Sequence, residues 1–359
     1  MLEKRQRIIG YDVARALAVF IMVFVNFNLV LTRVDDEGVL TGILNLLQGK
    51  GATLFIVLAG VGISLMIKAN VKNDEIKLRE KRNVLLKRAL FLFVFGLLYI
   101  SIWPADILHY YGFYISIGAL LMTSRSVNLW MIIVLLITVY PFILDFVDYE
   151  KGWNWKINEY TDFWTFTGFF RSLFINGFHP VIPWVAFVLA GIWLGKQNMA
   201  NKNKRNFILR LSLTIFVLVQ VGSYKFIEVV VLLTDIQVED AVAIYGTKPM
   251  PPMPLFMISG ISWSFIIIIV CIQMTEKVDR KNPLGFLAKT GQLAFTHYIL
   301  HVVVGILSAY LIFGENNLST LATFLYALSF CFALVVFSVF WRRKFTKDPV
   351  SIFMRSITG

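Results

Sequence analysis

The stretch YDVARALAVFIMVFVNFNLVL, residues 11–31, decides the fold class of this chain. A bilayer core about 30 Å thick needs roughly 20 residues of helix, so this apolar run predicts a helix that crosses a membrane. Similar stretches follow at about residues 51–69, 88–104, 107–123, 127–147, 178–195, 207–233, 255–275, 291–313 and 319–341. The sequence therefore predicts an all-α fold, a polytopic integral membrane helical bundle of about ten transmembrane helices.

Charge is sorted between the segments that connect these stretches. The N-terminus, the even-numbered loops and the C-terminus hold 26 of the 34 Lys and Arg residues. The odd-numbered loops hold 7, together with 14 of the 22 Asp and Glu residues. Because basic residues stay on the cytoplasmic side, both termini are expected in the cytoplasm and the odd loops outside. We expect a multi-pass protein of a cytoplasmic membrane.

The amino-acid composition argues against a soluble protein and against a nucleic-acid-binding protein. Of the 359 residues, 58% are hydrophobic, a share well above that of a soluble domain. The apolar stretches follow one another so closely that they leave no room for a separate soluble domain. We predict one integral membrane domain over residues 1–359, with outer loops at about 148–177 and 234–254 and a basic cytoplasmic loop at about 68–88. The net charge of +12 lies at the helix ends, which indicates membrane lipids as partners and no nucleic acid.

Asp12 and Arg15 are the first candidate site residues. They lie at positions i and i+3 of the first span, where opposite charges can pair. This spacing fits a structural ion pair, and it equally fits a phosphate or carboxylate site that uses the Arg guanidinium. Asn26 lies three turns deeper and is polar enough to need a partner.

Asp106 and His109 repeat the i and i+3 spacing at the outer start of the fourth span, within WPADILHYYGFY. A carboxylate that orients an imidazole raises its basicity, which suits a general base that acts on a hydroxyl or amine. Asp106 after Pro104 also fits a plain helix cap.

Two more clusters surround the remaining histidines. His179 lies between Pro residues at the start of the sixth span, and Arg171 precedes it, placed to neutralise an anionic group. His297 and His301 share one helix face in GQLAFTHYILH. Core hydrogen bonding or a substrate path suits this pair better than zinc, because no third ligand stands on that helix and no metal is expected.

Several motifs together resemble a known superfamily. They are RIIGYDVARALAVFIMVFVNF, FIVLAGVGISLM, PADILHYYGFYISIGALL, NGFHPVIPWVAFVLAGIWLG and GQLAFTHYILH, in this order along the chain. They are similar to YeiB-like bacterial membrane proteins and to the heparan-alpha-glucosaminide N-acetyltransferase family. The resemblance implies a transmembrane acyltransferase that takes an acyl group from cytoplasmic acyl-CoA and passes it to a sugar across the membrane.

The chain departs from the family pattern in the first helix. Ala16 stands where the family has Gly, and Asn26 stands where acyltransferases of the acyltransferase-three type carry a His. The lumenal acetyltransferases carry their His in the loop after the first helix, and this chain has no His between Phe27 and Lys50. If the chain is an acyltransferase, its general base must then be one of the four histidines of the chain, which are His109, His179, His297 and His301.

These observations combine into one leading hypothesis. Acyl-CoA, with acetyl-CoA the first candidate, would be the co-substrate, and Arg15 would meet its phosphates. Asn26 would donate to the thioester oxygen. His109, oriented by Asp106, would be the base, and His179 would help to bind an envelope sugar or glycolipid acceptor. The rivals are a transporter or flippase for a small or lipid-linked substrate and a non-catalytic membrane scaffold.

Overall fold

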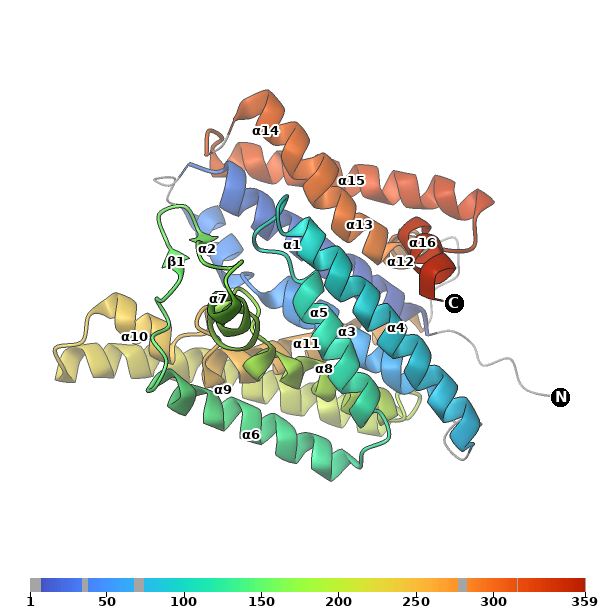
Figure 1. The fold of residues 1–359 in the computed structure, drawn as a ribbon, viewed down its shortest axis with the longest axis horizontal. Coiled ribbons are helices and arrows are strands. Elements are labelled where there is room, and N and C mark those ends of the chain that lie inside the picture. Colours follow the sequence, from blue (N-terminus) through green and yellow to red (C-terminus); the bar gives the residue numbers. More distant parts are fainter. Residues whose placement is uncertain (1–7, 34–37, 68–73, 277–282, 315, 359) are drawn as a thin grey trace. The chain divides into compact units, whose positions relative to one another are not determined.

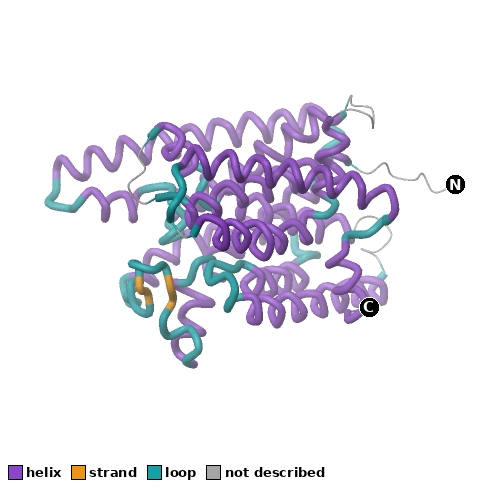
Figure 2. Tube along the Cα trace, turned by 90° about the horizontal axis from the view of Figure 1, so that it is seen from above, coloured by secondary structure: helices purple, strands orange, loops and turns teal. Residues whose placement is uncertain are grey.

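The computed structural model describes residues 8–33, 38–67, 74–276, 283–314 and 316–358, and these residues are mainly helical (Figures 1 and 2). Each predicted span coincides with a helix or with part of one. The described residues form two compact units. Unit 1 comprises residues 1–55 and 264–357, and unit 2 comprises residues 56–263 with 358–359. The prediction of a single domain stays a prediction.

Unit 1 is built around the first span. Its helices are α1 (Ile9–Leu31), α2 (Val39–Leu46), the start of α3 (Lys50–Met66), the end of α11 (Pro254–Thr275), α12 (Pro283–Gly291), α13 (Ala294–Leu300), α14 (Leu307–Phe313), α15 (Thr320–Lys344) and α16 (Pro349–Thr358). The π-helical segment η2 (His301–Ile306) joins α13 to α14. Glycines let α1 approach its neighbours closely, since a Cβ on Gly10 would lie 2.5 Å from the Ile272 Cα.

Unit 2 holds the middle of the chain. Its elements are the rest of α3 and the start of α11, with α4 (Glu75–Tyr99), α5 (Leu108–Leu121), α6 (Ser126–Leu144), β1 (Trp153–Asn154), β2 (Glu159–Tyr160), α7 (Phe166–Arg171), η1 (Ser172–Asn176), α8 (Val181–Lys196), α9 (Lys202–Leu233) and α10 (Val238–Tyr245). The strands pair antiparallel in a short hairpin, drawn in orange in Figure 2. The proline-rich segment between α10 and α11 is not helical, because Pro has no backbone N–H to donate.

Small residues of α3 make close helix packing possible in unit 2. A Cβ on Gly60 would lie 2.9 Å from the Gly191 Cα on α8, and a Cβ on Gly195 would lie 2.7 Å from the Ser64 Cβ. Helices α3 and α8 therefore pack closely at Gly60 and Ser64. Gly62, by contrast, has open space where its Cβ would stand.

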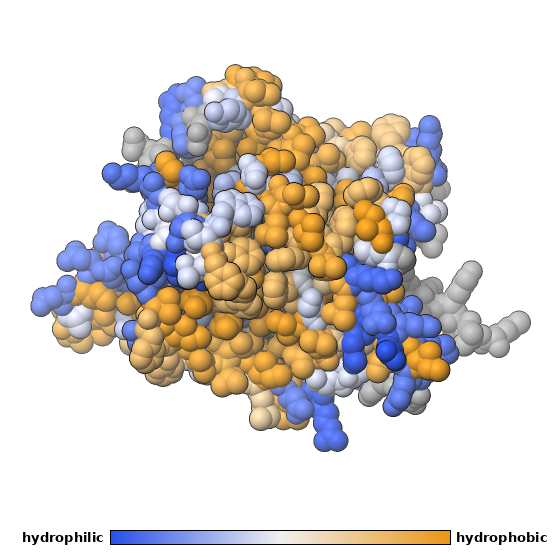
Figure 3. Space-filling view, in the orientation of Figure 1, coloured by the Kyte–Doolittle hydropathy of each residue, from blue (hydrophilic) through white to orange (hydrophobic). Residues whose placement is uncertain are grey.

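Seven helices or helix pairs of the described residues are long and apolar enough to cross a membrane. They are Ile9–Leu31, Val39–Met66, Ser126–Leu144, Lys202–Leu233, Pro254–Thr275, Ala294–Phe313 and Thr320–Lys344. An eighth is Phe166–Asn176 with Val181–Lys196, if this pair with its 45° bend is one span. The chain is thus a multi-pass membrane protein, and apolar surface covers the region over α6 (Figure 3).

The predicted spans at 88–104 and 107–123 form helices that fall short of this criterion. α4 begins in the basic segment, and the first turns of this helix form a hydrophilic patch (Figure 3). α5 has 14 residues, which gives about 21 Å of helix at 1.5 Å per residue, against a core of about 30 Å. The count of ten and the cytoplasmic termini stay predictions. The first part of the predicted loop 68–88, residues 68–73, lies outside the described residues.

Candidate active site

Asp106 and His109 form a buried pair at the start of α5. The Asp106 Oδ2 atom accepts the Leu108 backbone N–H at 2.8 Å and lies 3.4 Å from the His109 Nδ1 atom. One oxygen therefore serves both functions that the sequence left open, the helix cap and the orientation of the imidazole. Both residues are fully buried.

This contact assigns the His109 tautomer. Because a carboxylate oxygen only accepts, Nδ1 carries the proton and donates it to Asp106. The lone pair then lies on Nε2, which is buried and has no hydrogen-bond partner among the described residues. A buried acceptor without a partner costs free energy, and it can take a proton from a substrate hydroxyl or amine.

The close approach of α4 and α5 holds this pair in place. The two helices lie side by side in unit 2 (Figure 1). A Cβ on Gly112 would stand 2.6 Å from the Ala89 carbonyl oxygen and 2.9 Å from the Phe93 Cβ. Only glycine allows this approach, so the backbone that carries His109 is packed directly on α4.

Tyr110 connects His109 to the segment that carries His179. Its ring centroid lies 3.8 Å from that of His109 and 6.0 Å from that of His179. Its hydroxyl contacts the Ser172 Oγ at 3.3 Å, and a Cβ on Gly177 would collide with the Tyr110 hydroxyl. Asp106, His109 and His179 thus belong to one cluster, brought together from α5 and from the segment before α8.

His179 follows the π-helical turn η1 (Ser172–Asn176), a type of distortion that is frequent at functional sites. Its carbonyl accepts the Tyr114 hydroxyl at 2.5 Å, and its ring packs against Trp184 at 4.7 Å. The His179 Nδ1 and Trp184 Nε1 atoms are buried without hydrogen-bond partners in the described part of the chain. The site therefore offers three buried polar atoms to a ligand, the third being His109 Nε2.

Sequence reasoning missed several members of this cluster, namely Tyr110, Tyr114, Ser172, Gly177 and Trp184. Four of them stand inside or next to motifs that the sequence singled out. Their roles depend on contacts across the fold, such as the one that joins residues 62 positions apart in the Tyr110–Ser172 pair.

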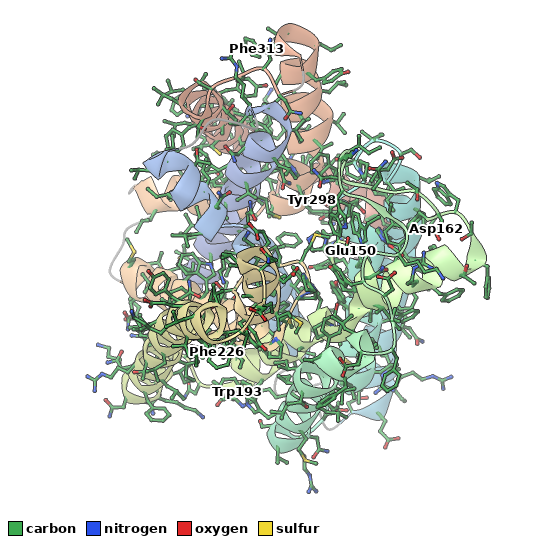
Figure 4. The ribbon with its side chains drawn as sticks, turned by 90° about the vertical axis from the view of Figure 1, so that its left-hand side faces the viewer. Glu150, Asp162, Trp193, Phe226, Tyr298 and Phe313 are labelled. Carbon is green, nitrogen blue, oxygen red and sulfur yellow. The ribbon has the colours of Figure 1, made fainter. Side chains whose placement is uncertain are left out.

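Arg171 holds the loop between α6 and α8 together. Its Nη2 donates to Asp162 Oδ2 at 2.5 Å and its Nε donates to the Tyr160 hydroxyl at 2.8 Å. The Tyr160 hydroxyl in turn donates to Asn176 Oδ1 at 2.6 Å. Burial raises the pKa of the Tyr160 hydroxyl above its ordinary value, which keeps this donor protonated. Glu150 and Asp162, labelled in Figure 4, lie in this loop.

Asn26 meets His301 in unit 1. The Asn26 Nδ2 atom lies 3.0 Å from His301 Nε2, and His301 Nδ1 contacts the Tyr298 carbonyl oxygen. A carbonyl only accepts, so Nδ1 carries the proton and Nε2 accepts from Asn26. Both imidazole nitrogens of His301 are therefore occupied, which leaves no lone pair for a substrate proton.

His297 differs from His301 in this respect. The Ser338 hydroxyl donates to the Leu334 carbonyl oxygen at 2.7 Å, so its oxygen accepts from His297 Nε2 at 2.7 Å. The His297 Nδ1 atom is buried and has no hydrogen-bond partner among the described residues. His297 is a second imidazole with an unoccupied nitrogen, and no carboxylate orients it in the described hydrogen bonds.

Asp12 and Arg15 form the ion pair that their spacing predicts. The Arg15 Nη1 and Asp12 Oδ1 atoms are 2.8 Å apart, and the Gln292 amide also approaches Asp12 Oδ2 at 3.4 Å. The Asp12 side chain is 2% exposed and the Arg15 side chain is 28% exposed.

Among the described residues, no three His, Cys, Asp or Glu side chains gather as metal ligands, and a metal-free site stays a prediction.

The family described as "Heparan-alpha-glucosaminide N-acetyltransferase, catalytic" matches residues 7–226, more than half of the chain. The chain belongs to this family. The match contains both α1 and the Asp106–His109–His179 cluster. A second family, described as "Protein of unknown function (DUF418)", matches residues 194–359, which include His297 and His301. The chain is thus a YeiB-like member related to the heparan-alpha-glucosaminide N-acetyltransferases, as its motifs predict. No curated protein matches it.

Proposed function

We propose that this protein is a membrane-embedded acyltransferase of the bacterial cytoplasmic membrane. It moves an acyl group, acetyl in the first instance, from cytoplasmic acyl-CoA to a hydroxyl or amine of an extracytoplasmic sugar or glycolipid. The observation that carries the proposal is the buried Asp106–His109 pair with its unoccupied Nε2 atom. Membership of the acetyltransferase family supports the same reaction class.

The reaction follows from the tautomer of His109. Its Nε2 takes the proton of the acceptor hydroxyl or amine while that oxygen or nitrogen attacks the acyl carbon of the thioester. The tetrahedral intermediate collapses, the carbon–sulfur bond breaks, and the imidazolium returns the proton to the departing CoA thiolate. Asp106 stabilises the imidazolium through Nδ1 and prevents rotation of the ring. Such base catalysis typically contributes about 10²–10⁴-fold to the rate.

The remaining residues have supporting roles in this proposal. His179 and Trp184 offer buried polar atoms next to the base and hold the acceptor. Arg15 is partly exposed beside Asp12, so its guanidinium can meet a phosphate of the donor. Asn26 gives one amide hydrogen to His301, and its contact with the thioester oxygen stays a prediction.

Purified protein in nanodiscs tests the proposal. We would add acetyl-CoA and envelope glycolipid, and measure CoA release together with transfer of labelled acetyl. The wild type should release CoA, His109→Gln should lose about 10²-fold or more of the rate, and His297→Gln, which changes an imidazole without a role in this reaction, should keep it. A wild type that neither binds nor consumes acetyl-CoA but moves glycolipid between leaflets would establish the rival flippase instead.

A further inference from the structure

Aromatic and acidic side chains gather on the hairpin of the outer loop, around Trp155. The Trp153 and Trp155 rings stack with centroids 4.4 Å apart and planes 11° apart, and Tyr149 stacks on Trp155 at 6.4 Å. Trp155 remains 40% exposed. We call Tyr149, Glu150, Trp153 and Trp155 the Trp155 platform.

The Trp155 platform is held rigidly. The Trp153 Nε1 atom donates to the Asn176 carbonyl oxygen at 2.7 Å. The Asn176 side chain donates to the carbonyl oxygens of Tyr149 and Lys151 at 2.8 and 2.9 Å. Gly152 has a φ of +90°, a conformation that favours glycine, and its carbonyl accepts the Thr161 N–H at 2.8 Å. A preorganised surface of this kind loses little entropy when a ligand binds.

Polar groups border the aromatic rings. The Glu150 carboxylate accepts the indole N–H of Trp155, and Glu150 itself is exposed. The Tyr149 hydroxyl is buried and has no hydrogen-bond partner among the described residues. Burial raises the pKa of Tyr149 well above its ordinary value, so this hydroxyl stays a donor. Apolar ring faces beside an exposed carboxylate suit a ligand that is apolar on one face and rich in hydroxyls at its edge.

The Trp155 platform is continuous with the candidate active site. Trp153 packs edge-on against Phe178 with centroids 4.8 Å apart. Phe178 directly precedes His179, whose ring lies within 6.0 Å of Tyr110 and so next to His109. The Trp155 platform therefore packs directly against the segment that carries His179.

The same loop offers a contrasting surface that a bilayer suits better. Trp164 is 69% exposed and Phe166 is 79% exposed. The Trp164 ring contacts Phe163, and the Phe166 ring contacts Phe170. Neither has a described hydrogen bond to a carboxylate. Such apolar aromatic residues are typical of membrane–water interfaces. Trp164 is thus a matched control for Trp155.

We infer that the Trp155 platform binds a pyranose ring of the acceptor, with the apolar face of the sugar on the indole and its hydroxyls on Glu150. The word acceptor rests on the proposed function, whereas sugar binding itself does not. A pyranose presents axial C–H groups on one face, which pack on an aromatic ring, and equatorial hydroxyls at its edge, which bond to a carboxylate.

Saturation-transfer NMR of the full chain in nanodiscs, with a panel of neutral methyl pyranosides and disaccharides and without acetyl-CoA, tests the inference. The wild type should bind at least one sugar, and Trp155→Ala should weaken that binding by about tenfold, the range for the loss of one aromatic contact. Trp155→Phe should keep most of the affinity and Trp164→Ala all of it. Thermal unfolding midpoints would verify that each variant is folded.

Three outcomes would overturn the inference. The first is a wild type that binds no sugar of the panel. The second is equal binding by Trp155→Ala and Trp164→Ala. The third is a spin label on Trp155→Cys that is reached by lipid-soluble oxygen rather than by an aqueous nickel chelate. The last result would place the platform in the bilayer interface. The binding assay contains no acetyl-CoA and is therefore independent of the transfer assay. Sugar binding together with no transfer in the assay that contains acetyl-CoA would refute the proposed function alone. Transfer without binding at Trp155 would refute this inference alone.

Discussion

Gly96 on α4 lies directly against the backbone of His109 on α5. A Cβ at position 96 would stand 2.8 Å from the Leu108 carbonyl carbon and 2.9 Å from the His109 Cα. The start of α5 can occupy its place only because position 96 has no side chain. The position of the proposed base therefore depends on a residue of another helix.

Gly96→Ala should displace His109. Forcing a methyl group into this contact should cost about 1–3 kcal/mol of stability, and a shift of about 1 Å at the base should reduce transfer by about 10²-fold. CoA release and thermal unfolding of the purified variant measure the two effects. The control is Gly62→Ala, where the added Cβ meets nothing within 4 Å and activity should not change.

Substitutions of Asp106 should separate its two roles. Asp106→Asn keeps an oxygen for the Leu108 N–H but removes the charge that holds the His109 tautomer, so transfer should fall by about 10²–10⁴-fold with little loss of stability. Asp106→Ala should also lose the cap, which costs about 0.5–2 kcal/mol. Equal activity of the wild type and Asp106→Asn would contradict the assigned orientation of His109.

Arg15→Ala should be strongly destabilising. The Asp12 side chain is 2% exposed, and removing the guanidinium that pairs with it should cost on the order of 3–5 kcal/mol. The exposed pair of Asp74 and Lys77 has the same i and i+3 spacing and the same 2.8 Å distance, so Lys77→Ala is a matched control without a measurable effect. Folded yield and the thermal unfolding midpoint of each variant measure the effect. Similar values for Arg15→Ala and Lys77→Ala would contradict the prediction.

Asn26 and His301 should be energetically coupled. A double-mutant cycle of Asn26→Ala and His301→Ala should give a coupling of about 0.5–1.5 kcal/mol in unfolding, as for one buried hydrogen bond. Purely additive effects would show that the two side chains do not interact.

Reporter fusions should reveal the topology. Fusions after Lys81 and Lys204 should report the cytoplasm, because each lysine lies in a basic stretch just before the apolar part of its helix, α4 or α9. Fusions within residues 150–160 should report the outside, where the Trp155 platform would meet its sugar. A fusion on the opposite side in either group would contradict the topology.

Local sequence was enough for the ion pair and for the base with its orienting carboxylate. Asp12 with Arg15, and Asp106 with His109, are three residues apart on one helix, so helical geometry alone brings them together. The sequence also predicts that Arg171 can neutralise an anionic group. In the structure its guanidinium donates to Asp162 and Tyr160, and both contacts depend on the path of the hairpin.

The sequence by itself determined the membrane class, the helices and the family, because apolar length, charge sorting and motif order are properties of contiguous residues. Only the tertiary structure decided which imidazole nitrogens are available. Asn26 and His301 are 275 positions apart, and His297 and Ser338 are 41 apart. The hydrogen bond from Asn26 occupies the second nitrogen of His301. In the described part of the chain, His297 Nδ1 and His109 Nε2 have no hydrogen-bond partner. A hydrogen bond acts over about 3 Å, so its partner is set by how distant helices pack rather than by the pattern along the chain.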